Sequence, residues 1–220
     1  MFLILIKLII YRFYYLLRFP RILPINYTIS VTNKCNARCK TCFIYTVKTD
    51  QMTVSEYRKV FKNIGKAPYW VTISGGEPFL RKDLPEIIIT LHKHCRPKII
   101  NIPTNGILTQ RIVYMVKQIC KALPKSEIII NLSIDGVGEE HDRIRSVPGN
   151  YQKAINTYKA LRKLEFPNLS VGIHTVISNY NINNFPAYLL FHNSLNYHYL
   201  EQTSNDERLY ISKSQPLETI

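Results

Sequence analysis

Two periodicities alternate along most of the chain. Runs of β-branched and other apolar residues predict strands at residues 27–32, 70–74, 99–103, 128–133, 169–177 and 196–201. Between them apolar residues recur every three or four positions, which predicts helices at 53–65, 83–95, 108–123, 151–164 and 182–193. Strands that alternate with such helices pair in parallel through right-handed crossovers. Because six units are fewer than the eight of a closed TIM barrel, we expect an α/β fold, an open (β/α)6 partial TIM barrel.

Two local signatures mark helix starts. Thr53 is followed three positions later by Glu56, and Asp83 is followed in the same way by Glu86. This spacing is typical of a capping box, in which the first side chain bonds the backbone of the third helical residue. We therefore expect Thr53 and Asp83 to cap the helices that follow them.

The first 24 residues have a different pattern. Residues 1–17 are almost wholly apolar or aromatic, but Lys7 and Arg12 interrupt the run, whereas a spanning helix takes about 20 apolar residues. No small-residue cleavage site follows, so the pattern is not that of a signal peptide. On a helical wheel, a side with Lys7 and Tyr11 opposes an apolar face made of Ile6, Ile9, Phe13, Leu16 and Leu17. This predicts an amphipathic helix in a membrane interface; a helix packed on the domain or on a partner is an equal alternative. The expected organisation is thus an N-terminal helix (1–24), a barrel (25–205) and a polar C-terminal tail (206–220).

Charge and cysteine content narrow the class of protein. The net charge is +14, and residues 1–49 hold eight Lys or Arg and no acid. Such a bias suits nucleic acid, anionic lipid or an acidic protein partner. No nucleic-acid-binding motif accompanies it, so nucleic acid is the least favoured partner. Five cysteines form an odd set, which argues against a secreted disulfide framework and favours a reducing cytoplasm.

Three of the cysteines form one cluster. Cys35, Cys39 and Cys42 have the spacing C-x3-C-x2-C directly after the first predicted strand. Thiolates so close together can hold one soft metal centre: zinc, copper(I) or an iron–sulfur cluster. A structural zinc site normally has four protein ligands, whereas three cysteines on a four-iron cubane leave one iron open to a small molecule. Cys95 and Cys120 continue apolar helical stripes, so we expect them in the core.

Further polar motifs follow the other strands. In parallel β/α folds, ligands gather at the carboxyl ends of the strands. The second strand is followed by Ser74-Gly-Gly-Glu-Pro78, where Gly75 and Gly76 allow the backbone to approach a ligand closely and Glu77 offers a carboxylate to an ammonium group. The third is followed by Asn105, which both donates and accepts hydrogen bonds.

The cysteine triplet followed by Gly-Gly-Glu-Pro after the next strand resembles the radical S-adenosylmethionine (SAM) superfamily. The resemblance covers roughly residues 25–201 and is closest to the peptide-modifying subgroup that often carries a C-terminal auxiliary-cluster domain. It implies a [4Fe-4S] cluster held by Cys35, Cys39 and Cys42, with SAM bound to the open iron. Reductive cleavage of SAM would give a 5′-deoxyadenosyl radical, which abstracts hydrogen from a substrate; a peptide or a lipid-linked molecule is favoured. The chain ends soon after the sixth predicted strand, so we expect a minimal enzyme, a truncated one or half of a two-chain system.

The resemblance also implies roles for single residues. Gly75, Gly76 and Glu77 match the motif that binds the SAM amino group, and Ser133 falls near the SAM methionine or ribose. Asn105 is a further candidate for cofactor binding, and Ile177 falls where the family packs against adenine. For Asp135, Asp142 and Arg145, ligand contact and a buried ion network are equal alternatives. One departure is that Thr41, not an aromatic residue, precedes Cys42, and the aromatic residue is Phe43.

Partners and alternatives complete the expectations. An acidic electron donor such as flavodoxin or ferredoxin is expected to dock on the basic N-terminal third, with the protein cytoplasmic and peripheral on the inner face of the membrane. One alternative is a degenerate, non-catalytic iron–sulfur scaffold protein. The other is a zinc-bearing, basic nucleic-acid-binding protein.

Overall fold

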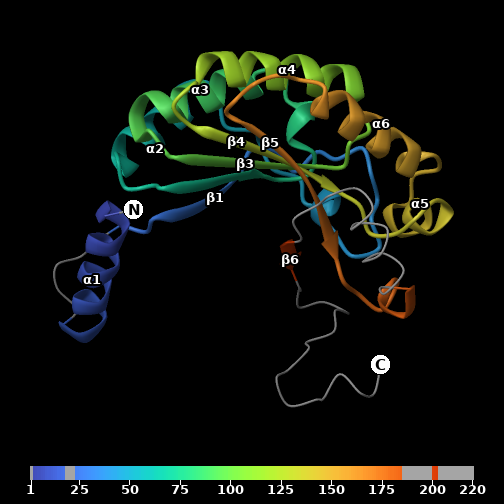
Figure 1. Cartoon of the computed structure of the whole chain (residues 1–220), viewed down its shortest axis with the longest axis horizontal. Helices are drawn as coiled ribbons and strands as arrows, with labels where there is room; N and C mark the ends of the chain where they lie inside the picture. The colour runs from blue at the N-terminus through green and yellow to red at the C-terminus, as the bar shows by residue number, and fades with distance from the viewer. Residues whose placement is uncertain (1, 18–22, 185–199, 203–220) are drawn as a thin grey trace.

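A single open sheet of six parallel strands organises the protein. The computed structural model describes residues 2–17, 23–184 and 200–202. The strands lie side by side in chain order and every neighbouring pair is parallel; they are β1 Asn26–Ser30, β2 Trp70–Ser74, β3 Ile99–Thr104, β4 Glu127–Ser133, β5 Leu169–Val176 and β6 Leu200–Gln202. Figure 1 shows the sheet as a curved layer with α2, α3, α4 and α6 on one face. The expected open partial barrel is confirmed.

The helices alternate with these strands. They are α1 Phe2–Leu17, α2 Val54–Ile64, α3 Leu84–Cys95, α4 Thr109–Ala122, α5 Glu139–Arg145 and α6 Asn150–Arg162, with short 3-10 turns η1 Ile44–Thr46, η2 Pro78–Leu80 and η3 Ile182–Asn184. The helix predicted over 182–193 is represented by η3, because residues 185–199 lie outside the described part of the chain. The predicted tail, residues 206–220, also lies outside it.

One of the two predicted helix caps is correct. The Thr53 hydroxyl accepts from the Glu56 backbone while the Glu56 carboxylate accepts from Thr53, a complete capping box. Asp83 makes no capping hydrogen bond, so that prediction is wrong. Its carboxylate instead pairs with Arg81 at 2.6 and 2.8 Å, because a bidentate charge-assisted contact is stronger than a single cap bond. The same guanidinium donates to the Val31 carbonyl, so this pair fastens η2 to the end of β1.

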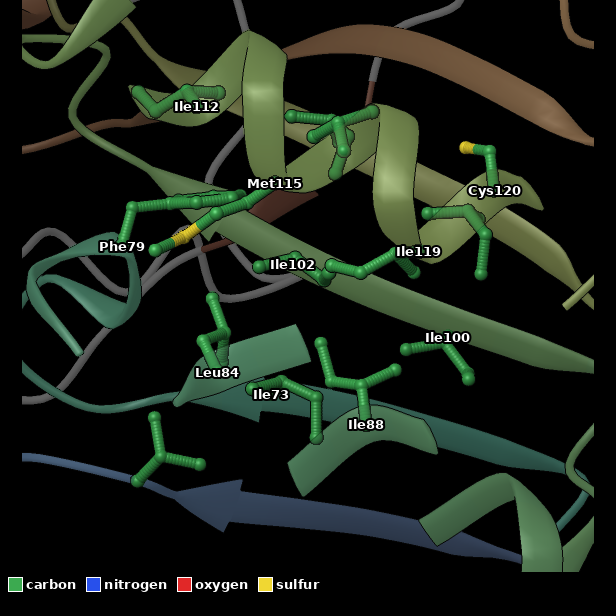
Figure 2. Close-up of a cluster of buried hydrophobic side chains, with 14 of the residues drawn as sticks. Ile73, Phe79, Leu84, Ile88, Ile100, Ile102, Ile112, Met115, Ile119 and Cys120 are labelled. Atoms are coloured by element: carbon green, nitrogen blue, oxygen red, sulfur yellow. The ribbon is translucent and has the colours of Figure 1, made fainter. Parts of the chain in front are cut away.

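The two faces of the sheet differ in polarity. The strand residues under the helices are apolar and fully buried: Val71, Ile73, Ile100, Ile102, Ile128, Ile130 and Leu132. Figure 2 shows Ile73, Ile100 and Ile102 packed with helix residues such as Ile88 and Ile119. The alternating positions on the opposite, concave face are mostly polar, among them Thr28, Thr72, Asn101, Ser133 and His174. A closed TIM barrel fills this side with branched apolar side chains, so the concave face here is built to border a cavity.

The two cysteines expected in the core are there. Cys95 and Cys120 are each 1 % exposed, and Cys120 lies in the hydrophobic cluster of Figure 2. Burial raises the pKa of the Cys95 thiol to about 11 and that of Cys120 to about 12. Both thiols therefore stay protonated and are poor metal ligands.

Candidate active site

A cavity of about 500 Å³ lies at the carboxyl ends of the strands. Its walls come from the loops after β1 to β4 and from the concave face of the sheet. The cavity brings together most of the residues predicted for the site: Cys35, Cys39, Cys42, Gly75, Gly76, Glu77, Asn105, Ser133 and Arg145. Side chains from distant parts of the sequence thus face one space.

The Gly-Gly-Glu loop holds the segment that leads into the cysteines. The Gly76 amide donates to the Thr32 carbonyl at 2.6 Å, and the Glu77 amide donates to the Lys34 carbonyl at 2.9 Å. A Cβ on Gly75 would lie 2.3 Å from the Thr32 oxygen, and one on Gly76 would lie 2.2 Å from the Lys34 oxygen. Both glycines are therefore required for contact between the two loops. Their approach to a ligand stays a prediction.

The C-terminus of α5 holds the other side of the cysteine loop. The amide of Arg38 donates to the Arg145 carbonyl at 3.3 Å, and that of Lys40 donates to the Ile144 carbonyl at 2.9 Å. These carbonyls belong to the last turn of a helix, where no partner within the helix is available. No local sequence signal indicates this contact, because it joins segments about a hundred residues apart.

The three clustered thiols differ in burial. Cys39 is buried, whereas Cys35 and Cys42 are half-buried. Burial raises the pKa of the Cys35 and Cys39 thiols. The guanidinium of Arg145 opposes that rise at Cys39, because its Nη1 lies 3.7 Å from Sγ. This cation favours the thiolate, which is the form that binds metal.

Arg145 is also paired with a buried carboxylate. Its Nε lies 2.7 Å from Oδ2 of Asp135, whose side chain is 1 % exposed. The N–H does not point along this short vector, so the contact is an ion pair rather than an aligned hydrogen bond. The other carboxylate oxygen accepts from the Val176 amide at 2.9 Å. Of the two alternatives, the buried ion pair is present, and Arg145 in addition lines the cavity.

A neutral histidine, His141, is hydrogen-bonded to the backbone of Asp135. The Asp135 amide donates to Nδ1 of His141, a fully buried ring whose pKa burial lowers to about 4. With Nδ1 as acceptor, the neutral ring carries its proton on Nε2 and must donate there. The Asn150 amide lies 3.1 Å from Nε2. As placed, the Asn150 side-chain oxygen has no hydrogen-bond partner. A half-turn of the amide brings this oxygen to Nε2, where it accepts the bond from the ring.

Three predicted residues do not line the cavity. Asp135 is buried in its ion pair with Arg145. Asp142 accepts from the amides of Gly149 and Tyr151, so it caps the start of α6. Ile177 is fully buried, and the adjacent Val176 lines the cavity in its place.

Glu77 is the buried carboxylate of the cavity wall. Oε1 accepts from the Phe79 amide and from the Thr104 hydroxyl, and Oε2 accepts from the Asn105 amide at 2.8 Å. Burial raises the pKa of Glu77 to about 7, although these bonds and the Arg145 charge oppose the rise. A nearby ammonium group would favour the ionised form. Contact with such a ligand stays a prediction, as does the cofactor role of Asn105, whose amide nitrogen donates to Asn36 in the cysteine loop at 2.7 Å.

The residues present fit a large, thiolate-bound group better than a single ion. Within the described ranges, no three His, Cys, Asp or Glu side chains are close enough together to hold one metal ion. A four-iron cubane is much larger and needs only one thiolate at each of three corners. Cys35, Cys39 and Cys42 on one loop, with a cavity beside them, provide that arrangement. Glu77 and Arg145 add the opposite charges that the ammonium and carboxylate of an amino-acid moiety require.

Comparison with known proteins gives the family. A model of the radical SAM superfamily matches residues 29–191. The pre-heme d1 synthase of Dinoroseobacter shibae is 31% identical over 170 residues, 73% of this chain and 38% of that protein. The probable GTP 3′,8-cyclase of Archaeoglobus fulgidus is 31% identical over 176 residues, 78% of this chain and 55% of that protein. The chain thus spans about half or less of the length of these relatives.

Solved structures agree on the fold. The enzyme anSMEcpe, solved with bound AdoMet (SAM) and a peptide, superposes with a TM-score of 0.64 at 19% identity, covering 89% of this chain and 55% of that chain. Members of the family use a [4Fe-4S] cluster and SAM, which are accordingly the cofactors of this chain. The family model covers well over half of the sequence, and a relative above 30% identity covers more than two thirds of it. The chain belongs to the radical SAM superfamily.

Proposed function

We propose that the chain is the catalytic core of a radical SAM enzyme. The observation that carries this proposal is that the cysteine loop and the Gly-Gly-Glu loop, each hydrogen-bonded to the other, line one cavity. When bound, the reduced cluster and SAM supply a 5′-deoxyadenosyl radical that takes a hydrogen atom from the substrate. The residues of the chain bind these groups, orient them and exclude water from them.

Each residue has a defined part in this proposal. Cys35, Cys39 and Cys42 hold the cluster through their thiolates. Glu77 accepts a hydrogen bond from the SAM ammonium with the one lone pair, on Oε2, that its three protein donors leave available. Arg145 contacts Cys39 and lines the same cavity, where its charge favours an anionic group.

We propose that electrons enter through a second, outer groove. This groove, of about 670 Å³, shares one wall with the inner cavity, because Cys35 lines both. Three exposed cations, Lys34, Arg38 and Lys48, border it against a single carboxylate, Asp50. A surface of this charge attracts an acidic partner and accelerates its association. An acidic electron carrier such as flavodoxin or ferredoxin therefore fits it.

The floor of the inner cavity favours a substrate that hydrogen-bonds without carrying charge. Asn101 donates to Thr72 at 3.4 Å and accepts from Asn131 at 2.9 Å, so uncharged amides and hydroxyls are linked across the concave face. His174 faces the same cavity, and burial lowers its pKa, which keeps the ring neutral. Backbone amides of a peptide match such donors and acceptors, so a peptide is the favoured substrate class, with a lipid-linked molecule as the alternative.

The experiment is anaerobic reconstitution with iron and sulfide, followed by reduction with dithionite in the presence of SAM. Formation of 5′-deoxyadenosine and methionine supports the proposal. A protein that holds the cluster but forms neither product would instead be the non-catalytic scaffold. Stoichiometric zinc without a brown chromophore would contradict both.

Matched cysteine variants identify the ligands. Replacing Cys35, Cys39 or Cys42 by Ala should abolish iron binding, which otherwise reaches about four irons per chain. Cys95→Ala and Cys120→Ala should keep full iron content, because both thiols are packed in the core. Loss of iron in these two controls would show that the ligand set is different.

A further inference from the structure

The end of the barrel opposite the cysteine loop carries a concentrated positive charge. A groove of about 430 Å³ lies there, and the residues that line it are His92, Lys93, Arg96, Pro97, Lys98 and Lys125. No acidic residue is among them. They come from the last turn of α3 and from the loops that lead into β3 and β4, so the parallel topology gathers them at the amino-terminal ends of the strands.

Hydrogen bonds of the buried Ser126 hold the segments that form this groove. The Ser126 hydroxyl bonds both His92 Nδ1 at 3.0 Å and the Pro97 carbonyl at 2.6 Å, which joins the two loops that form the groove. The lysine side chains on its rim are exposed. A helix C-terminus favours nearby cations and accounts for Lys93. It does not account for Lys98 and Lys125, which lie on loops before strands.

Helix α1 joins the barrel at this same end. The Ile25 carbonyl, just before β1, accepts from the amides of Tyr69 and Trp70, and the Tyr69 carbonyl accepts from the Lys98 amide at 2.9 Å. The loop before β2, at Tyr69, therefore lies between Ile25, where the N-terminal segment leads into β1, and Lys98 of the basic groove. Figure 1 shows α1 beyond the start of β1, away from the helices that cover the sheet.

The apolar face of α1 is uncovered. The five residues predicted to form it are between 38% and 67% exposed: Ile6, Ile9, Phe13, Leu16 and Leu17. On the other side of the helix, the Tyr11 hydroxyl donates to the Leu23 carbonyl, and Tyr15 is exposed. None of the described helices is long and apolar enough to cross a bilayer. A helix with this pattern lies in the plane of an interface instead.

From these two features we propose that the amino-terminal end of the barrel is a membrane-docking surface: α1 buries its apolar face among the acyl chains while the groove formed by Lys93, Lys98 and Lys125 binds anionic headgroups. An anionic bilayer is the partner that satisfies both, because it offers apolar depth and negative charge on one plane. The proposal is independent of the chemistry of the cavity.

Docking in this way orients the active site. The strands between the two ends contain five to eight residues in β1 to β5, a length of about 17–26 Å. The cavity and the outer groove at Cys35 therefore open on the side away from the bilayer. Substrate and electron carrier reach them from the aqueous phase.

The test is co-sedimentation of the full chain with phosphatidylcholine vesicles, with and without phosphatidylglycerol. We expect binding to the anionic vesicles and weaker binding at high salt. The triple variant K93E/K98E/K125E should bind at least about a hundred-fold more weakly, because each lysine near an anionic surface contributes about 1 kcal/mol. The charge-matched control R58E/K117E/K153E changes exposed cations on the outer helices and should bind as the unchanged protein does. Equal weakening in both triples would show a net-charge effect and overturn the basic groove as the site.

The contribution of the helix is tested separately. F13S/L17S removes two exposed apolar side chains and should abolish binding, while Y15S, which changes an exposed side chain on another face, should not. All variants should keep their far-ultraviolet circular dichroism and iron content, because none of these residues packs in the core. Full binding by F13S/L17S, or salt-sensitive binding to RNA but not to vesicles, would overturn the proposal.

Discussion

Arg145 and Cys39 are in direct contact, with the guanidinium Nη1 3.7 Å from Sγ. The same guanidinium is fixed by Asp135 on its other side, so its position does not depend on a flexible side chain alone. Hydrogen bonds and positive charge at a ligand sulfur stabilise the reduced, more negative state of an iron–sulfur cluster. We therefore propose that Arg145 acts through Cys39 as a positioning residue for the cluster.

The first prediction concerns the reduction potential. Arg145→Gln removes the charge beside Cys39, so we expect the midpoint potential of the cluster to become more negative, as measured by a redox titration monitored by electron paramagnetic resonance. Arg145→Lys should restore part of the shift, and Asp142→Asn, which alters only the cap of α6, should cause none. If Arg145→Gln changes SAM affinity at an unaltered potential, the contact with Cys39 has no electronic role.

The second prediction concerns pH and Glu77. Its pKa is about 7 in the folded protein, above the ordinary 4.5, so the folded state holds more protons between these two values. The free energy of unfolding contributed by Glu77 therefore falls as the pH rises from 4.5 to 7 and is constant above that range. The loss amounts to about 3 kcal/mol at about 1.4 kcal/mol per pKa unit.

Urea unfolding at several pH values measures this effect as the difference in unfolding free energy between the Glu77→Gln variant and the unchanged protein. Glu77→Gln has no ionisable group at this position, so its stability relative to the unchanged protein should increase from pH 4.5 to pH 7. Carboxylates with lowered pKa values, such as Glu56 and Asp83, give the opposite slope but cancel in the comparison. A difference that is independent of pH would mean that Glu77 has an ordinary pKa.

The third prediction concerns Gly76. A Cβ here would lie 2.2 Å from the Lys34 carbonyl, so Gly76→Ala must displace the cysteine loop. We expect loss of iron binding in a chain that stays folded. Gly65→Ala is the control: nothing lies within 4 Å of the Gly65 Cβ position, so the variant should keep its iron and lose only the roughly 1 kcal/mol that a side chain costs at the positive φ of Gly65, a strain that Gly76 does not have. Equal iron content in the two variants would show that the loop adapts.

The fourth prediction concerns the outer groove. K34E/K48E should slow SAM cleavage when the electron comes from reduced flavodoxin, and this effect should weaken at high salt, because steering by charge is screened. With dithionite as reductant the rate should be unchanged, since a small reductant needs no docking surface. R58E/K117E, on the outer helices, serves as the charge-matched control. Equal losses with both reductants would mean that the variant damages the cluster site.

The strand–helix order was predictable from the sequence because it rests on local periodicity. Alternation in the segment Ile99–Thr104 places Ile100 and Ile102 towards the helices, and this signal needs no tertiary information. The cap at Asp83 could not be predicted in this way. Arg81, which pairs with the Asp83 carboxylate, is only two residues away, but its guanidinium is held in place by bonds to the carbonyls of Val31 and Met52, which are distant in the sequence.

The site was predictable as a set of loops but not as a set of contacts. Strand ends in a parallel sheet converge, so Cys35, Glu77 and Asn105 were expected together. The contact of Arg145 with Cys39 spans 106 positions in the chain and depends on where α5 ends. The basic groove was equally hidden, because Lys93, Lys98 and Lys125 are separate in the sequence and only the crossover topology gathers them.

Cys35 belongs to the walls of two separate cavities, and this has a consequence for kinetics. A carrier in the outer groove and a substrate in the inner cavity occupy different volumes on either side of one residue. Neither has to leave before the other binds, so the two do not compete for space. The proposed function therefore predicts a ternary complex with random order of binding, in which raising the concentration of one partner leaves the apparent affinity for the other unchanged.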